Sequence, residues 1–376
     1  MKIAFVIPNL LPVGGNSATV LRYLRIASQQ KHKIVLFQSY KFHDPNEFPL
    51  PDLKKLGIEG PVYLRVQWYK IVEVTRKMPF GFIIHYLTYP FVIFLRQVIN
   101  RRRILKYGKF DGIYCFDLID ANIFPRRSGM LIVGTHNQKM GDFKAIAINL
   151  GFLIHRADGL RLFSNERKFV GQIWNKTCMV IPKGVDTDLF YPRAESINKE
   201  IRFLYVARLE PKKGLEILLD AWAHSLGPSC AELHIVGDGR LRGLVEESDV
   251  KGLIYHGALY EKPLQEMYRS CDVFIFPTLW DAQPSVVVEA VASGLKVLCS
   301  ERMRGALDDI EEAGFLKYVG ADSKSFASEI DMCCRVENTN FEERKMMHKF
   351  MVSNRSLVSE VDNILNFMQR LNANDK

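Results

Sequence analysis

The amino-acid sequence predicts an α/β protein of two doubly wound domains, each a parallel sheet with helices on both faces. The chain has 376 residues, which is comfortable for two domains. Short β-branched and aromatic runs alternate with longer segments of helical periodicity, and the alternation forms two successive series. Ligands of open parallel sheets bind beyond the carboxyl ends of the strands. We therefore expect the two domains to face a cleft lined by the loops that follow strands.

Twelve short apolar runs are expected to be strands, because such runs fit strands that are buried on both faces of a parallel sheet. In the first half they are Lys2–Pro8, Lys33–Ser39, Gly112–Phe116, Leu131–Thr135, Gly159–Ser164 and Met179–Pro182. In the second half they are Ile201–Ala207, Glu232–Gly237, Leu253–Gly257, Val273–Pro277, Lys296–Ser300 and Leu316–Val319.

The domain boundary is expected between Gly184 and Lys199. That stretch carries a glycine, a proline, three acids and little apolar periodicity, which is typical of a linker. The first domain would span residues 1–184 and the second residues 195–355. Apolar residues recur at helical spacing over Ser356–Leu371, and no strand follows. We expect residues 356–376 to return as a helix to the first domain.

The composition is that of a soluble globular protein, with 48% hydrophobic and 25% charged residues. The seven cysteines are scattered without metal-ligand spacing, which predicts free thiols in a reducing compartment and no bound metal. The amino-terminal run Lys2–Pro8 is too short to be a signal peptide. These features favour a cytoplasmic location.

The net charge of +9 is concentrated between Arg65 and Lys109, where ten basic residues accompany one acid, Glu73. Such an excess indicates an anionic partner such as phospholipid, polyphosphate or nucleic acid. The apolar, aromatic stretch Pro79–Leu95 lies inside it and falls just short of a membrane span. Two interpretations stay open: a buried helix pair, or a monotopic dock on the inner face of an anionic membrane.

Two motifs of the first half follow expected strands. Gly14 and Gly15 come after the first strand and would let a ligand approach the backbone and the following helix, although an ordinary glycine turn has the same pattern. His136 ends a strand, where it would contact a sugar hydroxyl or a phosphate, or serve only as a satisfied polar residue.

Two loops of the second half point to a nucleotide. Arg208 and Lys213 converge on one turn, and two cations there suit a diphosphate without a metal, whereas Lys212 fits a solvated position. The turn Gly237-Asp238-Gly239 permits close approach of a nucleotide, or is a plain turn that Asp238 caps.

The segment Trp280–Gly294 carries the strongest signal. Pro284 and Ser285 supply a helix start and Gly294 a stop. The helix between them is almost wholly apolar except for Glu289, and a carboxylate cannot be buried there without a hydroxyl or cationic partner. A ribose diol would satisfy it, and so would a structural salt bridge. The free N–H groups near Gln283–Val286 would face a diphosphate.

Together these loops resemble glycosyltransferase family 4, the retaining group with the GT-B architecture of two Rossmann-like domains. The resemblance covers nearly the whole chain and is strongest from Ile201 to Gly294. It is carried by Gly14-Gly15, by the Arg208–Gly214 loop, by the Val236–Gly239 turn, by Ile181–Asp186 and by the pair of acids at Asp281 and Glu289. The family usually has glutamate at the position of Asp281, and glycines at those of Ala282 and Pro284.

The resemblance implies a role for each site residue. Glu289 would bind the ribose hydroxyls, and Arg208 with Lys213 would hold the diphosphate. Asp281 and the backbone of Ala282–Ser285 would contact the donor sugar. The other positions that it implies are His136 near the sugar, Gly14 and Gly15 near the phosphate or acceptor, and Gly237, Asp238, Gln283, Pro284, Ser285 and Val286 around the nucleotide.

The expected function is that of a retaining, metal-independent hexosyltransferase without a cofactor. It would move a sugar from a nucleotide-diphosphate sugar to a hydroxyl acceptor, lipid-linked or on a growing glycan. Two alternatives stay open: a sugar-nucleotide epimerase of the same fold, and a non-catalytic protein that binds membranes or nucleic acid. A nucleic-acid partner is not expected, because the sequence lacks an RNP-like or recognition-helix pattern.

Overall fold

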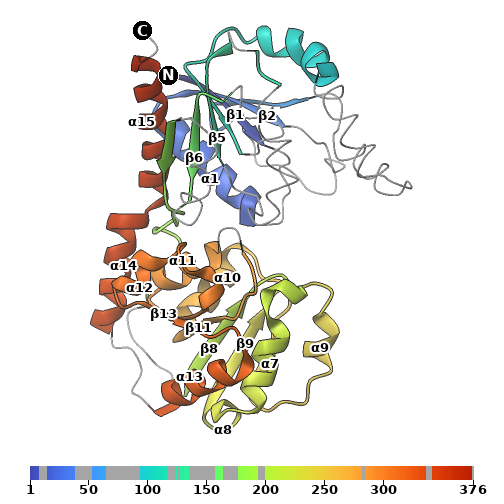
Figure 1. The fold of residues 1–376 in the computed structure, drawn as a ribbon, viewed down its shortest axis with the longest axis vertical. Coiled ribbons are helices and arrows are strands. Elements are labelled where there is room, and N and C mark those ends of the chain that lie inside the picture. The colour runs from blue at the N-terminus through green and yellow to red at the C-terminus, as the bar shows by residue number, and fades with distance from the viewer. Residues whose placement is uncertain are drawn as a thin grey trace. The chain divides into compact units, whose positions relative to one another are not determined.

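The fold comes from a computed structural model. It forms two compact units (Figure 1): unit 1 is Met1–Ile181 with Val361–Lys376, and unit 2 is Pro182–Glu360. The described residues are 1–7, 15–38, 53–64, 94–116, 123–125, 128–134, 157–163, 177–193, 200–281, 284–335 and 341–374.

Unit 1 is built on a parallel sheet in the order β3-β2-β1-β4-β5-β6-β7. The six strands expected in this half are all present. Helix α1 (Gly15–Gln29) follows β1, and residues 94–105 form a further helix. The strands are β1 (Lys2–Ile7), β2 (Lys33–Gln38), β3 (Ile58–Tyr63), β4 (Gly112–Cys115), β5 (Met130–Gly134), β6 (Gly159–Leu162) and β7 (Thr177–Val180).

Strand β3 was not expected from the sequence. It contains Gly60 and Pro61, which normally interrupt a strand because proline cannot donate to the ladder. The sheet order places β3 at an edge, where only one side needs partners. Gly60 and Pro61 are therefore tolerated in β3, although the local sequence pattern does not indicate a strand.

The carboxyl-terminal helix α15 (Leu357–Asn374) returns to unit 1, as expected. The helix packs over two glycines of the sheet. A Cβ on Gly112 would lie 2.4 Å from Sδ of Met368, and one on Gly159 would lie 2.6 Å from Cδ1 of Leu371. The amide of Asn372 donates to the carbonyl oxygen of Asp111 at 2.6 Å. Two strand glycines thus make room for the helix.

Unit 2 has a second parallel sheet, in the order β10-β9-β8-β11-β12-β13. All six expected strands are present. They are β8 (Ile201–Val206), β9 (Ala231–Val236), β10 (Leu253–Tyr255), β11 (Val273–Phe276), β12 (Lys296–Ser300) and β13 (Leu316–Val319). The helices are η3 (Pro211–Lys213), α7 (Leu215–Ala223), α8 (Gly227–Cys230), α9 (Arg242–Glu246), α10 (Glu261–Ser270), α11 (Ser285–Ala292), η4 (Glu301–Met303), α12 (Asp308–Glu312), α13 (Ser323–Arg335) and α14 (Phe341–Arg355).

Side chains of the second sheet alternate between two cores, because successive residues of a strand point to opposite faces. On β8, Phe203 and Tyr205 pack with α7 and α13, while Leu204 and Val206 pack with α10, α11 and α14. Helices therefore cover both faces of this sheet (Figure 1). The two parallel sheets confirm the predicted fold class.

The segment after Gly184 differs from the expected linker. Val185 and Phe190 are buried in the core of unit 2. The N–H of Val185 donates to the carbonyl oxygen of Arg355 at 2.8 Å, and the N–H of Leu357 donates to that of Val185 at 2.8 Å. The units divide at Ile181–Pro182. Val185 and Phe190 stand among turn residues, so the sequence pattern did not indicate that they are buried. The domain boundary was therefore predicted too far along the chain.

Candidate functional site

The site candidates of unit 2 gather where strands β8 and β11 lie side by side. The two strands are parallel. From β8 the chain order of the strands runs outward to β9 on one side, and from β11 it runs outward to β12 on the other side. Such a reversal opens a crevice at the carboxyl ends of the two strands, where nucleotides bind in sheets of this order. The loop after β8 supplies Lys213, and the loop after β11 supplies Asp281.

Lys213 and Asp281 form an ion pair between these two loops. Nζ of Lys213 donates a short hydrogen bond to Oδ2 of Asp281. The two side chains are only 12% and 17% exposed, and the ammonium lies 5.7 Å from the ring centroid of Phe276. The hydroxyl of Tyr205 donates to the carbonyl oxygen of Lys213 at 3.2 Å. The cation is thus held in a fixed, poorly hydrated position.

The two loops are also locked through their backbones. Gly214 adopts φ 74°, and a Cβ there would lie 1.9 Å from the carbonyl oxygen of Pro277, so only glycine fits. The N–H of Leu279 donates to the carbonyl oxygen of Lys212 at 2.9 Å, and the hydroxyl of Thr278 donates to the same oxygen at 3.1 Å. The position of Lys213 is therefore set by the fold.

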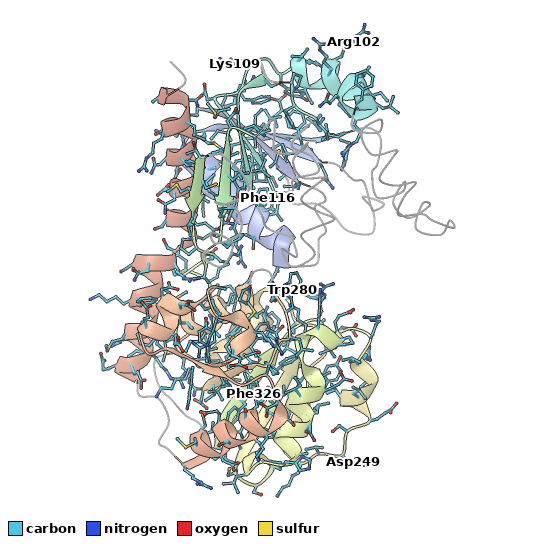
Figure 2. The ribbon with its side chains drawn as sticks, in the orientation of Figure 1. Arg102, Lys109, Phe116, Asp249, Trp280 and Phe326 are labelled. Carbon is cyan, nitrogen blue, oxygen red and sulfur yellow. The ribbon has the colours of Figure 1, made fainter. Side chains whose placement is uncertain are left out.

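Arg208 and Lys212 extend the positive charge of this edge. Arg208 is exposed, and within the described part of the chain no side-chain hydrogen bond or ion pair engages it. Nζ of Lys212 lies 5.4 Å from the ring centroid of Trp280. Trp280 is labelled in Figure 2. Partial burial, then the charges of Arg208 and Lys213, lower the pKa of Lys212. Lys212 therefore lies close enough to two further cations to be influenced by their charge, a setting that favours an anionic ligand.

The glycine turn after β9 packs against the loop after β8. Gly237 adopts φ 142°, and a Cβ there would lie 1.8 Å from the carbonyl oxygen of Ala207. The carboxylate of Asp238 accepts the N–H of Gly239 at 2.8 Å, as in the turn-capping alternative. The backbone of this turn thus lies beside the cationic loop, while the side chain of Asp238 serves the turn itself.

Helix α11 begins at Ser285, as the sequence predicts, and carries Glu289. The residue that precedes the helix, Pro284, occupies the N-cap position and provides no side-chain hydrogen bond to the first turn. The hydroxyl of Tyr268 on α10 donates to Oε2 of Glu289 at 3.2 Å and to the carbonyl oxygen of Val286 at 3.3 Å. Complete burial, and then the charge of Glu289, hold the pKa of Tyr268 well above its usual value. The hydroxyl partner that Glu289 requires thus comes from the protein itself.

Tyr268 is a site residue that the sequence analysis missed. It lies inside an amphipathic helix and not after a strand, so its position carries no motif. The one available signal was the need of Glu289 for a hydroxyl, which does not say which hydroxyl supplies it.

Several predicted positions lie outside the described residues: Gly14, His136, Gln283 and residues 65–93, which contain nearly all of the apolar stretch Pro79–Leu95. Gly15 is the first residue of α1, directly downstream of β1. Among the described residues no cluster of three or more His, Cys, Asp or Glu side chains is arranged to hold a metal ion. No helix in the same part of the chain has the length and hydrophobicity that crossing a membrane requires.

Comparison with known proteins finds a family that unit 2 resembles. Residues 200–335 match the family model described as Glycosyl transferases group 1. Bacillus subtilis EpsF is 30% identical over 143 residues, which cover 34% of this chain and 37% of that protein. An uncharacterized glycosyltransferase of Methanocaldococcus jannaschii is 24% identical over 283 residues, 66% of this chain and 71% of that one.

A solved structure extends the likeness to the whole fold. HepE of Anabaena, determined in complex with UDP and glucose, superposes with a TM-score of 0.68 at 16% sequence identity, covering 98% of this chain and 99% of that chain. Residues 200–335 are therefore similar to the glycosyl transferases group 1 family, and the chain as a whole has the two-domain GT-B fold.

Proposed function

We propose that this chain is a retaining glycosyltransferase that moves a hexose from a nucleotide-diphosphate sugar to a hydroxyl acceptor. The observation that carries the proposal is the half-buried Lys213–Asp281 pair at the strand reversal of a domain that resembles glycosyl transferases group 1. The binding of UDP and glucose by the HepE structure supports a nucleotide-sugar donor.

The diphosphate is assigned to the cations after β8. Asp281 orients Lys213, which would contact one phosphate, and Arg208 is exposed and would contact the second. The first turn of α11 contains no acidic side chain, and its N–H groups add positive potential. These groups would neutralise the charge on the leaving diphosphate without a metal.

The nucleoside is assigned to Glu289. Its carboxylate would accept hydrogen bonds from the ribose hydroxyls while Tyr268 holds one of its oxygens in place. The glycine turn Gly237–Gly239 would border the nucleotide. His136, Gly14, Gly15 and Gln283 keep the roles that the family resemblance implies.

The configuration of the anomeric carbon is retained if the leaving diphosphate also acts as the base that deprotonates the acceptor. The bond from the anomeric carbon to the phosphate oxygen breaks, and a bond to the acceptor oxygen forms on the same face. The acceptor proton passes to the departing diphosphate, whose charge Lys213 and Arg208 stabilise. No protein nucleophile is required, so catalysis rests on preorganised charge and positioning.

Nucleotide sugars are expected to stabilise the protein in a thermal-shift panel run in EDTA. A donor at 100 times its dissociation constant adds about 2.7 kcal/mol to the free energy of unfolding. The donor that shifts the transition most is then incubated with hydroxyl acceptors, and NMR of the anomeric signal should show retention. Interconversion of the donor sugar without transfer would instead indicate an epimerase, and an inverted product would contradict the mechanism.

Replacing Glu289 with alanine should weaken nucleotide binding by about 10- to 100-fold, because a hydrogen bond to a charged group contributes about 1.5–3 kcal/mol. Isothermal titration calorimetry with the nucleoside diphosphate measures this. Glu266→Ala on α10, which removes an exposed carboxylate paired with Lys262, is the matched control. An affinity equal to that of the control would remove Glu289 from the nucleotide site.

A further inference from the structure

The helix formed by residues 94–105 is fixed on unit 1 by one of its faces. Arg96, Asn100 and Ile104, spaced four residues apart, are buried there. Ile104 belongs to the core of unit 1, and the amide of Asn100 donates to the carbonyl oxygen of Arg96 at 2.8 Å. The guanidinium of Arg103 donates to the backbone of β3 at 2.7 Å. These contacts set which face of the helix points outward (Figure 1, turquoise).

The outward face carries a stripe of large apolar side chains. Phe94, Val98 and Leu105 are 62%, 54% and 45% exposed. At ~100° per residue the three fall within an arc of roughly 40°, on the side opposite the buried face. Apolar side chains aligned and exposed in this way indicate a contact surface.

Cations flank the stripe. Arg101 and Arg102 lie on either side of it in the helical projection, and both are exposed. Figure 2 shows Arg102 on the outer side of the helix. Lys106 and Lys109 follow and are also exposed, and no acidic residue occurs from Phe94 to Phe110. The surface therefore combines apolar side chains with uniform positive charge.

We propose that this face of the helix docks on an anionic lipid bilayer. Phe94, Val98 and Leu105 would enter the boundary between headgroups and acyl chains, and the cations would contact lipid phosphates. A nucleic acid would match the charge but leave the apolar stripe in water. Docking of this kind is separate from the proposed transfer reaction, because it uses no residue of the unit 2 site.

Vesicle co-sedimentation of the full chain tests the dock. The vesicles are phosphatidylcholine alone, or phosphatidylcholine mixed with phosphatidylglycerol. Arg101→Gln with Arg102→Gln should weaken binding to the anionic vesicles roughly 30-fold, since each interfacial cation contributes roughly five-fold. Phe94→Ser with Val98→Ser should weaken binding to the same vesicles at least as much, even at raised ionic strength.

Matched variants in unit 2 serve as controls. Arg242→Gln with Lys262→Gln removes two exposed cations, and Met346→Ser with Val352→Ser removes two similarly exposed apolar groups. Both should bind vesicles like the natural chain. Equal binding by all four variants, or binding of an oligonucleotide that displaces the vesicles, would overturn the proposal. The thermal shift with a nucleotide sugar should be unchanged in every variant, which separates loss of docking from failure of the donor site.

Discussion

Replacing Lys213 with alanine should reduce kcat/KM for glycosyl transfer by about 100-fold or more, the usual effect of removing one preorganised group that stabilises developing charge. The reason is its placement. The ammonium is mostly buried, lies 5.7 Å from the centroid of the Phe276 ring and is oriented by Asp281, so in the proposed reaction it would stabilise the leaving diphosphate without reorganisation. Steady-state kinetics with the donor found in the thermal-shift panel measures the change.

The variant must be separated from a general loss of charge or stability. Lys262→Ala removes an exposed lysine of the same unit and should keep near-normal turnover. The double variant Lys213→Ala with Asp281→Ala removes the carboxylate that the single variant leaves unpaired. It should stay as slow as the single variant if Lys213 acts on the diphosphate. Recovery in the double variant would mean that Lys213 only neutralises Asp281, and near-normal turnover of the single variant would sink the assignment.

Much of the fold could be predicted because buried parallel strands leave a local signal. Runs such as Lys296–Ser300 and Val273–Phe276 are short, apolar and β-branched or aromatic, and each recurs as a strand. The missed strand β3 lies at an edge and contains Gly60 and Pro61, so its sequence lacks that signal. Val185 and Phe190 were missed for a related reason: two apolar anchors among turn residues form no period.

In the candidate site, too, some features could be predicted from the sequence and others could not. The loops of Arg208–Gly214 and Gly237–Gly239 and the start of α11 could be predicted, because strand ends and helix starts are marked locally by glycine, proline and charge. The pairing of Lys213 with Asp281 could not, because it requires β8 and β11 to be neighbours in the sheet. That order is a property of the whole unit, and a local pattern does not contain it.

The start of β11 depends on a buried ion pair whose loss should be costly. Asp272 immediately precedes β11, and its Oδ1 accepts from the guanidinium of Arg344 on α14 at 2.6 Å. Both side chains are 1% exposed. Oδ2 of Asp272 accepts the backbone N–H of Arg202 on β8 at 2.9 Å. The carboxylate thus links α14 to the two strands whose opposite ends carry Lys213 and Asp281.

Arg344→Met should therefore lower the local free energy of unfolding around β11 by up to about 3 kcal/mol, because Asp272 is left buried with only the more distant Arg193, at 3.4 Å, as its counter-ion. Amide hydrogen exchange of the peptide that contains β11 measures this local loss of stability. A global unfolding experiment would not, because a two-domain chain does not unfold in a single two-state transition.

The neighbouring Lys345→Met is the matched control for Arg344→Met. It removes an exposed ion pair with Glu342 on the same helix and should change stability by no more than about 1 kcal/mol. Asp272→Asn combined with Arg344→Met should recover part of the loss, because it removes a buried charge that only Arg193, 3.4 Å away, would still pair. If Arg344→Met exchanged no faster than the control, the pair would not be what holds β11. The geometry of Lys213 and Asp281 would then have to rest on the loop contacts around Gly214 alone.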